Sequence, residues 1–160
     1  MSLIRVVWGS ATGPTKMASY DAALAAAGVE NYNLVPVSSV IPAGVPVEAV
    51  GTAPDLGPVG DRLTVVEARA TAAGPSSVAA GLGWVESVDG GPGLFYEAAG
   101  EIDAADVETR IREGLVAGAE LRQEWDLGDH SIRVERSEAV SGTYTTAVVL
   151  AVYGESEPIV

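Results

Sequence analysis

Two adjacent serines, Ser38 and Ser39, carry the strongest chemical signal in the sequence because they lie inside an apolar segment, residues 33–42 (NLVPVSSVIP). Two hydroxyls fill an apolar strand poorly, and a proline closes the segment. Taken alone, these residues favour a hydrogen-bonded pair of serines at the end of a strand. A second pair, Ser76-Ser77, follows Gly74-Pro75 and is typical of a turn.

The other residue types exclude most kinds of catalytic site. The sequence has no cysteine, so disulfides and thiolate metal sites are excluded. His130 is its one histidine, and the neighbouring residues predict a surface turn. Residues 9–13 follow an expected strand and precede an expected helix, but they lack the Gly-Lys-Ser/Thr ending of a phosphate-binding loop. An enzyme of this composition must find an electrophile elsewhere, and its own backbone is one source.

The charge is strongly acidic. The 22 acidic and 9 basic residues give a formal net charge of −13, which opposes binding to nucleic acid and to anionic lipid. The acids are scattered and Lys16 is the one lysine, a composition typical of a protein solvated for a salty cytosol. The apolar run 147–153 is too short to span a membrane, and residues 1–8 do not resemble a signal peptide. We expect a soluble, halophilic, cytoplasmic protein with no nucleic-acid or membrane partner.

Hydrophobic spacing predicts two helices among many strands. Helices are expected over residues 16–27, ended by Gly28, and over 103–125, with Asp103 as N-cap. Strands are expected over 3–8, 31–41, 62–72, 77–85, 93–99, 132–140 and 143–153, with a long loop over 42–60 and a loose tail after 153. This order predicts an α+β fold with mainly antiparallel sheet in one domain, residues 1–160. The apolar run near the C-terminus predicts a strand buried on both faces.

Residues 33–42 resemble the self-cleavage site of the pyruvoyl-dependent arginine decarboxylases. That family carries Asn-Leu, two or three residues, then Ser-Ser, an apolar pair and proline, and this sequence has the same order. The resemblance covers essentially the whole chain and also rests on Gly9-Ser10, residues 20–24, Ala27-Gly28, Leu94–Glu97 and Gly100. Ala98-Ala99 departs from the pattern, since a bulkier and more acidic pair is common there.

The resemblance implies that Ser39 attacks the carbonyl of Ser38 and that the chain is cut between them. The products would be an N-terminal β chain, residues 1–38, and a C-terminal α chain, residues 39–160. Ser39 would become a covalent pyruvoyl cofactor, and Asn33 would polarise the carbonyl of Ser38 during the cut. The cofactor would then act as an electron sink for the decarboxylation of L-arginine to agmatine, a precursor of polyamines.

The resemblance also implies roles for four more residues. Glu97 matches the proton donor, and burial on an apolar strand would raise its pKa. Asp21 matches the residue that binds the guanidinium group through two parallel N–H bonds. Ser10 and Leu24 would line the pocket, and no metal is expected. The family's fold is a layered αββα sandwich, and its trimers place each site between subunits, so Asp21 and Ser39 could serve one site from different chains.

Three other interpretations stay open. A related pyruvoyl enzyme could decarboxylate another amino acid such as histidine, because Asp21 indicates only a cationic substrate. An uncleaved, non-enzymatic oligomeric binding protein could keep the same fold, although the joint presence of Asn33, Ser38, Ser39 and Glu97 argues against it. An enzyme with a phosphate ligand at residues 9–13 has little support beyond the turn glycines.

Overall fold

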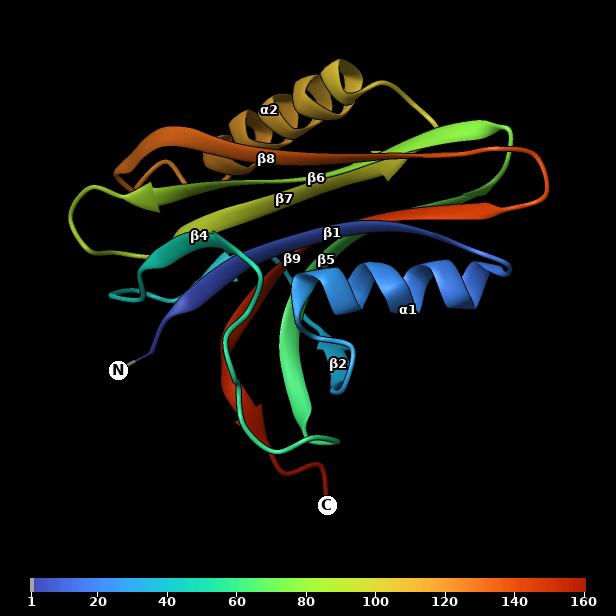
Figure 1. The fold of residues 1–160 in the computed structure, drawn as a ribbon. Helices are drawn as coiled ribbons and strands as arrows, with labels where there is room; N and C mark the ends of the chain where they lie inside the picture. The colour runs from blue at the N-terminus through green and yellow to red at the C-terminus, as the bar shows by residue number, and fades with distance from the viewer. Residues whose placement is uncertain (1) are drawn as a thin grey trace.

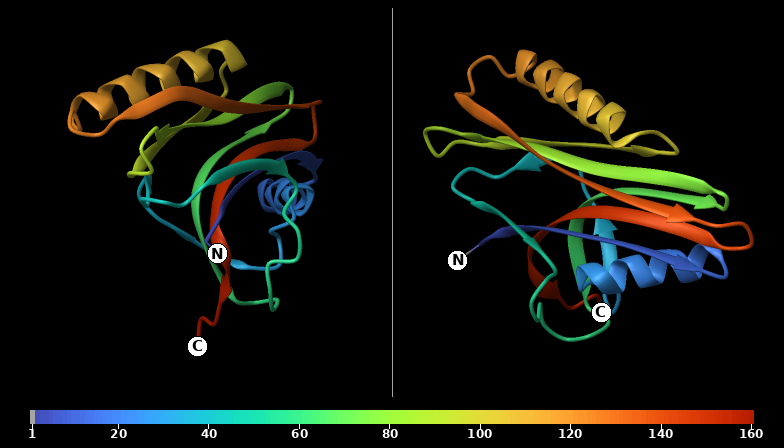
Figure 2. Two further views of the ribbon diagram at one scale, coloured as in Figure 1. Left: turned by 90° about the vertical axis from the view of Figure 1, so that its left-hand side faces the viewer. Right: turned by 45° about the horizontal axis from the view of Figure 1, so that its top comes forward.

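The computed structural model describes residues 2–160. In chain order its elements are β1 (Ile4–Gly13), α1 (Lys16–Ala27), β2 (Asn33–Pro36), β3 (Val40–Ile41), β4 (Val47–Gly51), β5 (Arg62–Ala73), β6 (Ser76–Ser87), β7 (Gly93–Gly100), α2 (Ala104–Glu120), β8 (Leu127–Ala139) and β9 (Tyr144–Glu157). They stack in four layers, with α1 on one sheet, a second sheet behind it and α2 on the far side (Figures 1 and 2). The predicted α+β class and αββα layering are confirmed.

The chain passes between two sheets, and one of the crossings joins the edge strands β2 and β3. Sheet A has the order β2-β5-β9-β1-β4 and sheet B has the order β3-β7-β6-β8. Most neighbouring strands are antiparallel, and the two parallel pairs in the described chain are β1 with β4 and β2 with β5. Because β2 ends one edge of sheet A and β3 ends an edge of sheet B, the chain crosses between the sheets from β2 to β3.

The strand predicted to be buried on both faces is the middle strand of sheet A. Residues 147–152 of β9 are fully buried. Successive side chains of a strand point to opposite faces. Val148, Leu150 and Val152 therefore pack on the α1 side, whereas Val149 and Ala151 pack on the side facing sheet B. The apolar run in the sequence reflects this two-sided burial.

Helix α1 begins and ends as predicted. The Thr15 hydroxyl accepts a hydrogen bond from the Ala18 N–H at 3.0 Å, which caps the first turn. Gly28 ends the helix with φ 82°, a left-handed conformation that favours glycine. Ala23 and Leu24 are buried against sheet A, and Asp21 lies on the exposed side of the helix.

The segment predicted as one strand over residues 31–41 is instead two strands in different sheets. β2 pairs with β5 and β3 pairs with β7. Pro36 ends β2 on a sheet edge, where a missing N–H is tolerated. Ser38 and Ser39 lie between the two strands.

Other boundaries also differ from the predictions. The expected loop 42–60 contains β4, which pairs with β1. Residues 9–13, expected to form a turn, extend β1 along β9, and β9 itself continues to Glu157 in the expected loose tail. Helix α2 ends at Glu120 rather than at residue 125, and β8 begins at Leu127, so His130 lies in a strand and not in a turn. The added strand residues share a cause, because distant strand partners stabilise segments whose local sequence favours turns.

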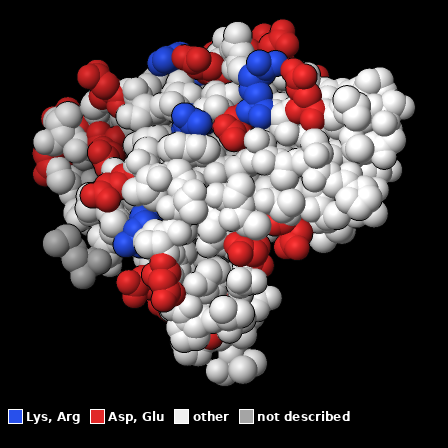
Figure 3. Space-filling model, in the orientation of Figure 1, with Lys and Arg blue, Asp and Glu red and all other residues white. Residues whose placement is uncertain are grey.

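Acidic side chains lie at several separate places on the face drawn in Figure 3. On this face they outnumber the basic side chains and form no single patch. Neither helix within residues 2–160 has the length and apolar character needed to span a membrane.

Two glycines of β6 let α2 approach sheet B closely. Val107, Ile111 and Leu115 form the buried stripe of α2. A Cβ added at Gly81 would lie 2.6 Å from Cγ1 of Val107, and one at Gly83 would overlap the Ile111 side chain. The position of α2, which covers β7, therefore depends on the absence of side chains here.

We expect the Gly83→Val variant to lower the free energy of unfolding by about 1–3 kcal/mol, because the added side chain forces α2 away from β6. Urea unfolding in concentrated KCl measures this change. The control is Ser77→Val on the exposed part of the same strand, which should change stability by no more than about 0.5 kcal/mol. Equal midpoints for the two variants would contradict close packing at Gly83.

Candidate active site

Ser38 and Ser39 lie at the crossing between the two sheets. On the upstream side, the Val37 N–H donates to the carbonyl of Val65 in sheet A at 2.9 Å. On the downstream side, Val40 begins β3 in sheet B. Ser38 is exposed and Ser39 is half-buried, and neither belongs to a strand. The peptide bond between them is therefore held from both sides without being part of a sheet ladder.

Three hydrogen bonds order the backbone after Ser38. The Val40 N–H donates to the Ser38 carbonyl at 3.1 Å, and the Phe95 N–H of β7 donates to the Ser39 carbonyl at 2.8 Å. The Tyr153 hydroxyl donates to the Val40 carbonyl at 2.8 Å. A donor on the Ser38 oxygen polarises the carbonyl that is predicted to be attacked. Because the peptide group between Ser39 and Val40 both accepts and donates, the first two bonds strengthen each other.

A groove of about 410 Å³ opens beside the serines. Its lining is mostly apolar and comes from the junction, β7 and the C-terminal half of α2: Ser38, Ser39, Val40, Leu94, Phe95, Tyr96, Gly114, Leu115, Ala117, Gly118, Leu121 and Arg122. The ring of Tyr96 rests on Gly114, where any Cβ would collide with it. Tyr96 also lines a neighbouring hollow of about 460 Å³, so its ring stands between the two spaces.

Glu97 lies in that neighbouring hollow, together with Arg110 and Glu113 of α2. In the antiparallel register of β3 and β7, Val40 pairs with Leu94, so Glu97 lies a few residues along β7 from the serines. Burial raises the pKa of the Glu97 carboxyl above its ordinary value, and a hydrogen bond from its own backbone N–H opposes part of the rise. Ser39 and Glu97 are thus brought to the same edge of sheet B.

Asp21, Leu24 and Ser10 are not brought to this edge within one chain. They lie on α1 and β1 of sheet A, and none of them lines the groove that contains the serines. Asp21 is exposed, whereas Leu24 is buried in the core beneath the helix. A shared site for Asp21 and Ser39 therefore requires a second copy of the chain, and this stays a prediction.

Asn33 is also separated from the serines. It begins β2, so three strand steps, roughly 10 Å, separate it from Pro36 and the junction lies beyond. Its side-chain amide donates to the Gly60 carbonyl at 2.7 Å. A role for Asn33 at the carbonyl of Ser38 stays a prediction, because within one chain its side-chain amide is bonded to Gly60 instead.

A polar cluster beside Asp21 anchors helix α1 to strand β5. The Tyr20 hydroxyl donates to Oε2 of Glu67 at 2.7 Å, and the Arg69 guanidinium lies 4.7 Å from the centre of the Tyr20 ring. Burial, followed by the hydrogen bond to Glu67, raises the pKa of Tyr20 to about 12. The hydroxyl therefore remains a donor, and it anchors the helix to β5 one residue before Asp21.

The amino-acid sequence does not reveal the backbone and tyrosine contacts of the junction. The Val40 N–H has no side-chain signature, so residue types cannot reveal it. Tyr153 appeared only as the last residue of an apolar strand. Its distance from Ser39 along the chain hides the contact, which depends on the two sheets lying face to face.

Comparison with known proteins identifies the family. The family model described as pyruvoyl-dependent arginine decarboxylase matches residues 3–158. Pyruvoyl-dependent arginine decarboxylases of two Halobacterium salinarum strains are each 54% identical over 159 residues, which is 99% of this chain and 98% of theirs. The chain belongs to the pyruvoyl-dependent arginine decarboxylase family. The family's protein from Pyrococcus abyssi is 35% identical over 146 residues, 89% of this chain and 88% of its own.

The residues at the junction fit the covalent pyruvoyl cofactor of the family. Ser39 has the carbon skeleton from which such a group is made, and the preceding carbonyl is polarised by the Val40 N–H. The Phe95 N–H holds the Ser39 carbonyl, which would remain in place after a cut before Ser39. The groove beside Ser39 leaves space for a small molecule.

We expect the Glu97→Gln variant to be more stable than its parent at about pH 7–8, with the gap closing as the pH falls toward about 4. Because burial raises the pKa of Glu97 in the folded state, folding at about pH 7–8 places an ionised carboxylate where it is poorly hydrated. Below about pH 4 the carboxyl is protonated in both the folded and the unfolded states, and this penalty disappears. Thermal unfolding across this pH range measures the gap.

Both proteins in this test carry Ser39→Ala, so neither chain is cut. Glu124→Gln, an exposed glutamate after α2, controls for the removal of one negative charge from a chain of net charge −13. If Glu97→Gln and Glu124→Gln gave the same pH dependence, the burial of Glu97 would not be responsible.

Proposed function

We propose that this chain cuts itself between Ser38 and Ser39 and decarboxylates L-arginine to agmatine and carbon dioxide. The observation that carries the proposal is the position of the serine pair, outside any strand, with the Val40 N–H on the carbonyl of Ser38. The relatives named as pyruvoyl-dependent arginine decarboxylases support the substrate.

In the self-cleavage, Oγ of Ser39 attacks the carbonyl carbon of Ser38. The new C–O bond forms as the C–N bond between the residues breaks, and the hydroxyl proton passes to the nitrogen of Ser39. Loss of the α-proton of Ser39 then expels the carboxylate of Ser38, and water converts the dehydroalanine to a pyruvoyl group with release of ammonia. The products are chains of 38 and 122 residues (160 − 38 = 122).

The pyruvoyl group supplies the electron sink for loss of carbon dioxide. The raised pKa of Glu97 keeps a larger share of its carboxyl protonated, so Glu97 can give a proton to the substrate's α-carbon. Asp21 binds the guanidinium group through two parallel N–H bonds, with Ser10 and Leu24 beside it. Asn33 assists the self-cleavage by polarising the carbonyl of Ser38.

We infer that the active site is completed between copies in a trimer or a multiple of trimers. Asp21 and the serines lie on different elements and share no groove within one chain, so a common site requires a second copy. Val35, Val37 and Val40 are each about two-fifths exposed around the serines, with fractions of 39%, 41% and 40%. At such an interface these apolar side chains would be covered. The charge of −13 opposes association, so we expect assembly to need the salt of a halophilic cytoplasm.

Intact mass spectrometry of the purified protein tests the self-cleavage. We expect two species, split after Ser38, with the larger one blocked by a pyruvoyl group at its N-terminus. The Ser39→Ala variant should remain one chain because it lacks the attacking oxygen. The matched control is Ser77→Ala, from the other serine pair, which should be cut like the parent. A parent chain that stays whole in concentrated KCl would favour a non-enzymatic binding protein.

The Asp21→Asn variant tests the choice of substrate. We expect kcat/KM for arginine to fall by roughly 30-fold or more, because the guanidinium loses its charged partner at the proposed interface between copies. Release of carbon dioxide from arginine measures this, with self-cleavage checked by mass. Asp106→Asn, in the exposed first turn of α2, is the control and should keep the parent's activity. Faster turnover of histidine than of arginine by the parent would establish the other substrate.

A further inference from the structure

Val40 is held at both of its backbone polar groups. Its N–H donates to the Ser38 carbonyl, and its own carbonyl accepts from the Tyr153 hydroxyl at 2.8 Å. β3 contains only two residues and is an edge strand. Besides the Phe95 N–H of β7 on the neighbouring Ser39 carbonyl, the Tyr153 hydroxyl is therefore a contact from the opposite sheet that orders Val40.

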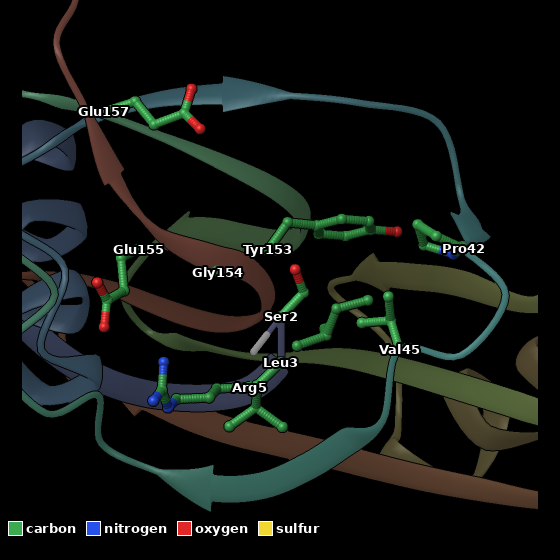
Figure 4. A pocket seen from close by; sticks show the side chains of 10 residues that line it. Ser2, Leu3, Arg5, Pro42, Val45, Tyr153, Gly154, Glu155 and Glu157 are labelled. Atoms are coloured by element: carbon green, nitrogen blue, oxygen red, sulfur yellow. The ribbon is translucent and has the colours of Figure 1, made fainter.

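Tyr153 reaches Val40 from the opposite sheet. It belongs to β9 of sheet A, where it pairs with Thr64. The next residue of β5, Val65, accepts the hydrogen bond from Val37 on the upstream side of the serines. Neighbouring positions of sheet A thus hold both sides of the Ser38–Ser39 bond. Figure 4 shows the Tyr153 side chain extending toward the chain at Pro42, across a pocket of about 620 Å³.

The ring of Tyr153 is fixed by packing. Its centre lies 6.1 Å from that of Phe95 in a tilted arrangement, and Phe95 is the residue whose N–H holds the Ser39 carbonyl. Burial raises the pKa of Tyr153 to about 12. The hydroxyl therefore stays protonated and remains a donor around neutral pH.

We propose that Tyr153 is a positioning residue for self-cleavage, because its hydroxyl holds Val40 in the orientation that directs the Val40 N–H at the carbonyl oxygen of Ser38. The inference rests on the proposed function. When Oγ of Ser39 attacks, negative charge develops on that oxygen, and a donor already in place stabilises it without reorganisation. Without the hydroxyl, Val40 rotates more freely and the N–H is aligned for a smaller share of the time.

The Tyr153→Phe variant tests the proposal, since it removes the hydroxyl and keeps the ring. The full chain is synthesised in a cell-free translation with a labelled amino acid, synthesis is stopped, and the uncut fraction is followed on gels in concentrated KCl. We expect the rate constant of cleavage to fall about tenfold, the effect of losing one ordinary hydrogen bond. Cleavage at the parent's rate would overturn the proposal.

The matched control is Tyr32→Phe. The Tyr32 hydroxyl donates to the Gly57 carbonyl at 2.9 Å, so this variant also loses a bond from a half-buried tyrosine to a backbone carbonyl. We expect Tyr32→Phe to be cut at the parent's rate. Equal slowing of both variants would show that general loss of stability is responsible, and would overturn the proposal. An uncut parent chain would instead contradict the proposed function itself.

Hydroxylamine identifies the step that is affected, since it cleaves an ester at Ser38 but not a peptide bond. Because the proposed alignment precedes the acyl shift, uncut Tyr153→Phe chains should resist hydroxylamine. Their rapid cleavage would show that the ester forms normally, which the proposal forbids. Two non-natural amino acids of similar size at position 153 control for effects on folding. 4-Aminophenylalanine keeps a hydrogen-bond donor and should restore most of the rate of cleavage. 4-Methylphenylalanine has no donor and should not restore it. Equal rates for this pair would overturn the proposal.

Discussion

The site depends on one constraint, that residues 37–40 must pass from sheet A to sheet B. A peptide bond within a sheet is locked in a ladder of hydrogen bonds, with its carbonyl engaged by a neighbouring strand. The peptide bond between Ser38 and Ser39 escapes this, because β2 ends on β5 before it and β3 begins on β7 after it. The carbonyls of the two serines are held by single bonds from the Val40 N–H and the Phe95 N–H, one of which lies within the junction itself. The crossing therefore leaves the bond between the serines ordered yet open to attack.

The same crossing places the site on open sheet edges, which usually need protection from other chains. β3 covers β7 only at Gly93 and Leu94, so the rest of β7, including Glu97, has no strand beside it on that side. The exposed valines beside the serines offer apolar surface for a second copy, whereas the net charge of −13 opposes its approach. Salt would screen this charge and leave the apolar surface unchanged, so the proposed assembly is expected to depend on salt.

The sequence predicts the elements whose cause is local. The apolar run of β9, Gly28 at the end of α1 and the stripe of α2 follow from spacing and conformation. The division of residues 31–41 between two sheets, and β4 within the expected loop, depend on partners distant in the chain, which no local pattern contains. The same holds for the site. Ser39 and Glu97 were found through resemblance to a family, but the hydrogen bond from Tyr153 to Val40 depends on two sheets meeting face to face.

The fold also explains how the proposed cut can leave the protein intact. Residues 1–38 contribute β1, α1 and β2. β1 lies between β9 and β4 and pairs with β9 along its whole length, from Ile4 with Tyr153 to Gly13 with Tyr144. The N-terminal chain cannot leave without exposing the core under α1, so cleavage changes the covalent connection and not the packing. β3 is much shorter, and after the proposed cut it would lie one residue from the new N-terminus at Ser39. The Phe95 N–H on the Ser39 carbonyl and the Tyr153 hydroxyl on the Val40 carbonyl would then hold this N-terminus from both sheets.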